Sequence, residues 1–133
     1  MSYTIHITYH PQYLHAMVEG DNSAKNVDRY FTDIQHAIGE HRCTNVLIEE
    51  RLTGPGLDPF DIFEVIRTQA RFARSHQLRI AYVDLNKDHH RTTVAFGENL
   101  ANILGVNIKV FSTSLEAMVW LTRTDLSRQN DEQ

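Results

Sequence analysis

Carboxylates, histidines and one threonine follow two apolar segments of the sequence, where they could act on a ligand. The segments are Val46–Ile48 and Leu78–Val83, and the polar side chains after them are those of Glu49, Glu50, Thr53, Asp84, Asn86, His89 and His90. Glu50, Asp84 and one histidine could bind a metal ion or share acid–base work. The sequence has no H-E-x-x-H motif and no Cys/His pairs, so we predict no metal, no cofactor and no catalytic residue. We interpret the group as an edge that binds a ligand or a partner.

Three other histidines could share one face of a β-hairpin. Apolar and polar side chains alternate on both sides of Pro11-Gln12, which is the pattern of two paired strands. A turn there pairs Ile5 with Val18, Ile7 with Ala16, and Tyr9 with Leu14. His6, His10 and His15 then lie on the opposite face and could bind zinc. An exposed or helix-covered polar face explains the same pattern without a ligand.

A glycine-rich loop leads into a helix at Asp58-Pro59. Asp suits the position before a helix and Pro suits its first residue. Gly54-Pro55-Gly56 at such a helix start could hold an anion. Asp58 and Asp61 place negative charge at the same point, so we expect no anion site.

These residues are positioned by alternating strands and helices. After the hairpin we predict strands at 45–51, 79–85 and 106–111, and helices from about 24 to 40, 58 to 76 and 92 to 104, with a last short helix after Thr113. Three successive strand–helix–strand connections require parallel strands with right-handed crossovers. The fold class is therefore α/β, of order β-β-α-β-α-β-α-β-α. Its five-stranded mixed sheet has strands 2–5 parallel and strand 1 antiparallel.

The apolar stripes predict which helix faces are buried. In the second helix they select Ile62, Phe63, Ile66, Ala70 and Ala73, and in the third Phe96, Leu100, Ile103 and Leu104. Phe60 and Phe72 fit the stripe of the second helix poorly, and together with Phe63 they could cover an apolar pocket or a partner surface.

Composition predicts one ordinary globular domain. The chain has 133 residues, is 41% hydrophobic and has a net charge of −4 with a pI of about 6.0, which argues against a nucleic-acid partner. No apolar run approaches the roughly 18 residues of a membrane span, and no signal peptide opens the sequence. We expect a cytoplasmic protein with one domain at 1–124 and a polar tail at 125–133.

Two stretches of the sequence resemble the SpoIIAA-like proteins of the STAS-like superfamily, which are related to bacterial anti-sigma factor antagonists. Leu78-Arg79-Ile80-Ala81-Tyr82-Val83 looks like the family's fourth strand, which often reads "RIAVV". Residues 108–121 look like its last strand, turn and helix, ending in "A-x-x-W-L" as Ala117 to Leu121 do here. The element order matches over roughly residues 3–122. The resemblance implies a regulatory module that binds a protein partner.

One departure from the family pattern concerns its phosphorylation switch. The family carries a phosphorylatable serine in the turn that opens the helix after the third strand. Here Thr53 to Asp61 contains no serine, and Asp58 stands at the helix start. We therefore expect no phosphorylation switch.

The leading hypothesis is a non-catalytic STAS-like module that binds a protein partner, itself or a small ligand. A carrier of apolar ligands is one alternative, because the related CRAL-TRIO lipid-binding class resembles this fold. A small hydrolytic enzyme that uses Asp84 with His89 or His90 is the other.

Overall fold

The computed structural model describes residues 2–131, and for residues 123–131 the helical backbone alone. The strands are β1 (Tyr3–Tyr9), β2 (Leu14–Asp21), β3 (Asn45–Thr53), β4 (Arg79–Asp84) and β5 (Asn107–Phe111). The helices are α1 (Ala24–His41), α2 (Pro59–Ser75), α3 (Arg91–Ile103) and α4 (Ser114–Asp131). This order confirms the predicted α/β class.

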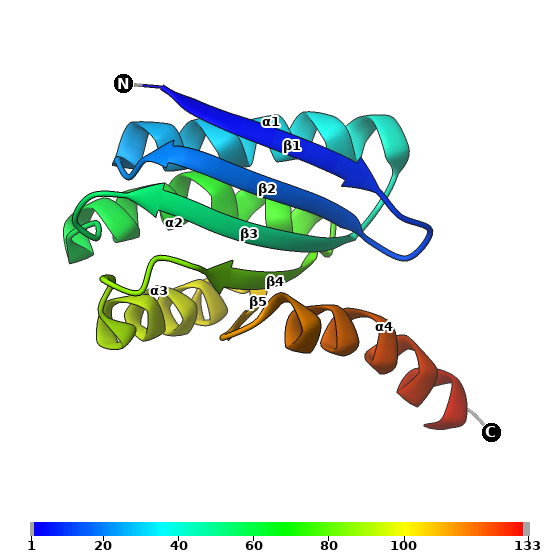
Figure 1. Ribbon diagram of the computed structural model, residues 1–133. Helices are drawn as coiled ribbons and strands as arrows, with labels where there is room; N and C mark the ends of the chain where they lie inside the picture. The colour runs from blue at the N-terminus through cyan, green and yellow to red at the C-terminus, as the bar shows by residue number, and fades with distance from the viewer. Residues whose placement is uncertain (1, 132–133) are drawn as a thin grey trace.

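The strands form one sheet in the order β1-β2-β3-β4-β5 (Figure 1). β1 pairs antiparallel with β2, and the hairpin register is the predicted one, with Ile5 opposite Val18 and Ile7 opposite Ala16. The other pairs are parallel. Because the four parallel strands point the same way, the loops that follow them meet at one edge of the sheet, which we call the carboxyl edge.

The strand order decides which face each helix covers. Every crossover moves one strand along the sheet in the same direction, so right-handed connections place α1, α2 and α3 on one face. The three helices pack side by side there, and α4 packs against β3, β4 and β5 on the other face (Figure 1). The outer face of the hairpin is open to solvent in the described part of the chain, where His6, Thr8 and His10 are exposed.

The two faces hold separate hydrophobic cores. The larger core lies beneath α1–α3 and centres on Leu14, Ala16, Val18, Tyr30, Val46, Ile48 and Leu52. The smaller core lies beneath α4 and contains Tyr13, Leu47, Ala81, Val83, Ala117 and Leu121. Consecutive residues of β3 alternate between the two cores, as strand geometry requires.

The prediction is wrong for three residues that were expected to face the core. Phe63, Phe96 and Ile103 are 40%, 41% and 79% exposed, whereas Val65, Ala70, Ala73 and Ala101 are buried. α2 and α3 approach each other closely at Gly97, where an added Cβ would lie 3.5 Å from Ile62 Cγ2. The prediction is confirmed for Ala70 and Ala73, which are buried, and for Ile66 and Leu104, which pack against the core. The close approach of the two helices leaves no room between them for Phe63, Phe96 and Ile103.

The last helix is longer than predicted. α4 extends to Asp131 and includes most of the segment assigned to a polar tail. Residues 114–131 contain neither Gly nor Pro, so no helix-breaking residue interrupts α4. Within the described residues, no helix is long and apolar enough to cross a membrane.

Candidate functional site

A cavity of about 420 Å³ lies at the carboxyl edge, between the sheet and helices α1–α3. Its walls are mainly apolar and include Val27, Phe31, Ile62, Val65, Ile66, Val94 and Ala101. A smaller apolar cavity of about 60 Å³ shares Phe31, Val65, Ile66 and Ala101 with it. The volume is in the range of small-molecule sites, roughly 300–1,000 Å³.

Glu50 brings a buried carboxylate to the polar end of this cavity. Its side chain leaves β3 on the helix-covered face, and the residue is 4% exposed. The Tyr30 hydroxyl donates to Glu50 Oε2 at 2.5 Å, and the Tyr82 hydroxyl donates to Oε1 at 2.6 Å. Each carboxylate oxygen therefore has one protein donor, as a buried carboxylate requires.

Burial controls the ionisation of this group. Removal from water raises the pKa of Glu50 to about 7, even though the two tyrosine hydrogen bonds oppose the rise. Burial and the neighbouring Glu50 charge also raise the pKa values of Tyr30 and Tyr82 well above their usual value. Both phenols therefore stay protonated and remain donors at physiological pH.

His89 joins the cluster from the loop after β4. Its Nδ1 lies 2.6 Å from Asp84 Oδ2, and both side chains are nearly buried, at 5% and 8% exposed. Burial lowers the pKa of His89, but the hydrogen bond and charge of Asp84 and the carbonyl of Gly54 outweigh it, and the net pKa is raised. His89 Nδ1–H therefore donates to the Asp84 carboxylate.

The second ring nitrogen of His89 connects three loops of the carboxyl edge. Nε2 lies 3.1 Å from the Gly54 carbonyl oxygen, 3.1 Å from Asn86 Nδ2 and 3.4 Å from Asn22 Nδ2. Asn22 also donates to the Pro55 carbonyl oxygen at 2.8 Å. Both nitrogens of His89 are thus engaged within the protein, and the ring holds the loops after β2, β3 and β4 together.

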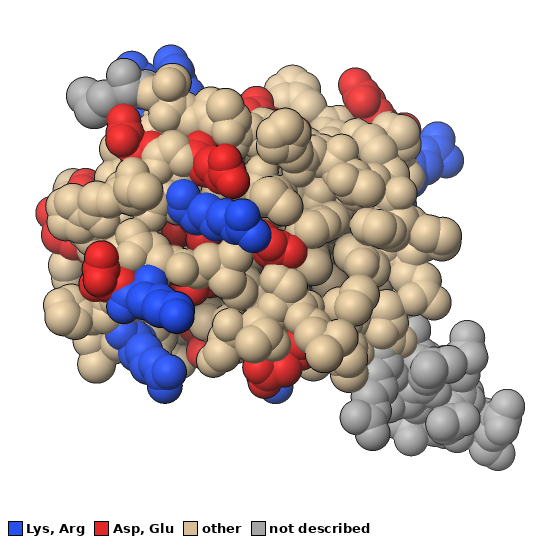
Figure 2. Space-filling model, viewed as in Figure 1, with Lys and Arg blue, Asp and Glu red and all other residues tan. Residues whose placement is uncertain are grey.

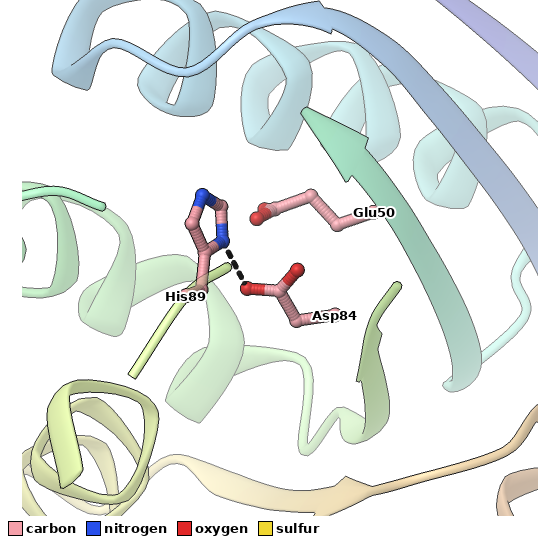
Figure 3. Close-up of side chains that lie close together, drawn as sticks. All are labelled: Glu50, Asp84 and His89. Atoms are coloured by element: carbon pink, nitrogen blue, oxygen red, sulfur yellow. Dashed lines mark hydrogen bonds and ion pairs between the residues drawn. The ribbon is translucent and has the colours of Figure 1, made fainter. Parts of the chain in front are cut away.

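Glu50, Asp84 and His89 converge on one point (Figure 3). One potential ligand atom from each lies within 4.8 Å of the other two. Two carboxylates and an imidazole form a donor set that a divalent transition-metal ion accepts. In the described residues this is the one group that could hold a metal ion.

The other predicted site residues lie outside this cluster. Thr53 is exposed and its hydroxyl donates to the Gly20 carbonyl oxygen at 3.2 Å. Asp58 is the exposed N-cap of α2 and accepts from Asp61 N at 2.8 Å, as predicted. His90 is exposed at the start of α3 and borders the cavity mouth. The two adjacent histidines therefore diverge.

The hairpin histidines do not form a metal site in the described residues. The rings of His10 and His15 are 6.3 Å apart, and His10 stacks on Tyr13 instead. His15 Nε2 lies 2.8 Å from Glu49 Oε1. The polar sheet face therefore accounts for these residues.

Sequence reasoning missed Tyr30, Tyr82 and Asn22. Tyr30 lies within the helix predicted from about residue 24 to 40, and Tyr82 lies within the apolar segment Leu78–Val83. A buried tyrosine hydroxyl needs a hydrogen-bond partner, and Glu50 ends a buried apolar run. Together, these two facts could have indicated that the tyrosine hydroxyls donate hydrogen bonds to Glu50.

Comparison with known proteins supports the architecture. No protein-family model matches the chain, and no curated protein matches its sequence. The solved structure of a serine-to-glutamate variant of RsbS from Moorella thermoacetica is similar, with a TM-score of 0.57 at 13% sequence identity. The match covers 93% of this chain and 97% of the RsbS chain. The resemblance seen in the sequence is confirmed for the fold: this chain has the STAS-like, SpoIIAA-like architecture.

Proposed function

We propose that this protein is a non-catalytic regulatory module that binds a small, largely apolar molecule in the carboxyl-edge cavity. The observation that carries the proposal is the cavity of about 420 Å³, with apolar walls and a hydrogen-bonded polar cluster at one end. Pockets of this make-up use the walls for affinity and a few fixed polar groups for orientation. This proposal combines two hypotheses from the sequence, binding of a small ligand and carriage of an apolar molecule.

The hydrolytic alternative has less support from the geometry. A general base needs a nitrogen free to take a proton from water or substrate. Nδ1 of His89 is bonded to Asp84, and Nε2 faces a carbonyl and two amides. His90 is exposed at the start of α3 rather than beside Asp84. We assign His89 a positioning role instead.

Native mass spectrometry and a cavity-blocking variant test this function. We expect protein purified under gentle conditions to retain a small molecule, or to take up 1-octanol with a measurable heat. Ala101→Leu adds carbon atoms to a buried residue that lines the cavity and should abolish uptake. Ala95→Leu makes the same change at an exposed position of α3 and should leave it intact. Equal uptake by both variants would contradict the proposal.

A protein-docking edge at the start of α2 is a second candidate. Phe60 and Phe63 are 69% and 40% exposed, and solvent-exposed aromatic residues are enriched in interfaces. Asp58 and Asp61 already supply negative charge beside them, so docking here would not need phosphorylation of Thr53. Loss of a partner in Phe60→Ser pull-downs, with unchanged unfolding, would support this role. Undiminished partner recovery would remove it.

A further inference from the structure

The acidic character of the cavity points to the chemical class of its ligand, and this inference rests on the proposed function above. Among the described residues that line the cavity, Glu50, Asp84, Asp88 and Glu98 are acidic, and none is Lys or Arg. His89 and His90 also line the cavity, but the four acidic groups outnumber them. A site with an excess of negative groups concentrates ligands of positive charge. An anionic ligand would meet repulsion from these groups.

Glu50 and Asp84 differ in how their charges are compensated. Asp84 is paired with His89, whose raised pKa favours the positively charged ring. Glu50 has two phenol donors, but no Lys, Arg or His of the described residues forms an ion pair with it. The His89 ring lies within 4.8 Å of the Glu50 carboxylate but is hydrogen-bonded to Asp84, so it compensates the charge of Glu50 only in part. A buried carboxylate whose charge is incompletely compensated is costly. Glu50 is therefore the group that a bound cation would satisfy.

The geometry allows one small cationic group to reach both carboxylates. Since an oxygen of Glu50 and an oxygen of Asp84 lie within 4.8 Å of each other, a single nitrogen can donate to both at about 2.8 Å. The carboxylate of Glu50 and the ring of His89 face the same space (Figure 3). Each Glu50 oxygen keeps a lone pair after accepting from its tyrosine.

We propose that the cavity binds a primary or secondary ammonium group carried on an apolar body. The ammonium lies between Glu50 and Asp84, and the apolar body lies along Phe31, Ile62, Ile66 and Val94. Both halves of the cavity are then used: the acidic end for charge and the walls for burial. Burial raises the pKa of Glu50 to about 7, and an ammonium group beside it would favour the charged carboxylate.

Three probes with the same alkyl chain separate this inference from the proposed function. Octylamine, 1-octanol and octanoate are titrated calorimetrically at pH 7.5 into protein treated with EDTA. We expect octylamine to bind about tenfold more tightly than octanol, because its hydrogen bonds are charge-assisted, and octanoate to bind most weakly. Octanol or octanoate binding as tightly as octylamine would overturn the ammonium assignment while the ligand-binding function stands. Failure of all three to bind the folded protein would overturn both.

Adjacent glutamates provide a matched pair of variants. Glu50→Gln should remove the preference for octylamine over octanol and leave octanol affinity within about twofold, because the change is isosteric. Glu49→Gln makes the same change on the opposite face of β3 and should keep the preference. If both variants lost the preference for octylamine equally, the overall negative charge of the protein rather than the Glu50 carboxylate would explain it, and the site would be overturned. If Glu50→Gln does not fold, Asp84→Asn in the same assay should reduce the preference, and an unchanged preference would overturn the site.

Metal analysis gives an independent check. The same cluster supplies a donor set for a divalent ion, so protein purified without chelator is analysed for bound metal. We expect less than one tenth of an equivalent. About one equivalent that disappears in Glu50→Gln would assign the cluster to a metal ion and overturn the ammonium proposal.

Discussion

Glu49 and Glu50 are neighbours in β3, yet they occupy two different environments on opposite faces of the sheet. Glu49 is 7% exposed and Glu50 is 4% exposed. Glu49 lies 2.8 Å from His15 Nε2 and 3.9 Å from Arg51 Nη2. Glu50 has only neutral phenol donors, and burial raises its pKa to about 7. The two glutamates are therefore similarly buried but differ in their partners: Glu49 forms ion pairs, whereas Glu50 lies at the cavity and accepts from two phenols.

The two faces of the sheet also differ in how completely their cores are filled. Beneath α4, a small core closes around side chains such as Ala81, Ala117 and Leu121, all at 0% exposure. Beneath α1–α3, the core contains two cavities. On the α4 side, charged side chains gather toward the carboxyl edge, and the area over the hairpin turn is nearly free of charge (Figure 2). One face is closed by packing, and the other leaves unfilled space between the sheet and its helices.

The largest expected effect tests this difference in packing. Leu121→Ala should lower the free energy of unfolding by about 2–5 kcal/mol, because it opens a void in a closed core. Ile66→Ala removes a side chain that already borders both cavities and should cost at least about 1 kcal/mol less, since fewer contacts are lost. Denaturant unfolding of the two variants measures this. Equal costs would show that the two faces are packed alike.

The next effect concerns the pH dependence of stability. The pKa of Glu50 rises from 4.5 to about 7 on folding, so the folded protein holds this proton more tightly than the unfolded chain. The free energy of unfolding should therefore fall by about 3 kcal/mol between pH 4.5 and 7 from this group alone. Glu50→Gln should flatten the fall over that window. Urea unfolding at half-unit pH steps measures it, and an unchanged slope in the variant would refute a raised pKa.

The fold could be predicted from the sequence because its signals are local. Alternation in residues 4–19 determined the hairpin register, and the apolar runs at β3, β4 and β5 determined the parallel sheet. The inward faces of α2 and α3 could not be read in the same way. They depend on the close approach of the two helices at Gly97, which is a tertiary property.

The candidate site was predicted in part. Glu50, Asp84 and His89 follow the ends of β3 and β4, so the rule for parallel sheets brought them together. Whether His89 or His90 joins the cluster depends on the path of the loop after β4. Contacts of His89 with Asn22, Gly54 and Asn86 hold that path. The cavity itself had no sequence signal, because it is space left between helices.

His89 should affect the free energy of unfolding less than Glu50 does. Its effect comes from holding three loops together rather than from the cavity. His89→Ala leaves the Asp84 carboxylate with the Asn86 N–H as a donor but without its cationic partner, and should cost about 2 kcal/mol. The pKa of His89 is raised in the folded protein, so its contribution is complete below about pH 6.5 and declines as pH rises through the folded value. Unfolding at pH 6 and pH 9 should thus show a smaller difference from wild type at pH 9.

His90→Ala is the control for that experiment, because His90 is exposed beside the same loop. It should change the free energy of unfolding by less than about 0.5 kcal/mol. Hydrogen exchange should also accelerate in the loops after β2 and β3 of His89→Ala and not of His90→Ala. Equal behaviour of the two variants would remove the positioning role of His89.

The smallest effect is expected at Glu49, the counterpart of Glu50. Its carboxylate contacts His15, whose side chain is 21% exposed, and Arg51, which is 49% exposed, so solvent screens both interactions. Such pairs contribute about 0–1 kcal/mol, and Glu49→Gln should cost no more than that at pH 7. Because the amide keeps the shape of the side chain and can still accept a hydrogen bond, the packing of β3 against α4 should survive. A loss above about 2 kcal/mol would contradict this expectation and mean that solvent does not screen the interactions of Glu49.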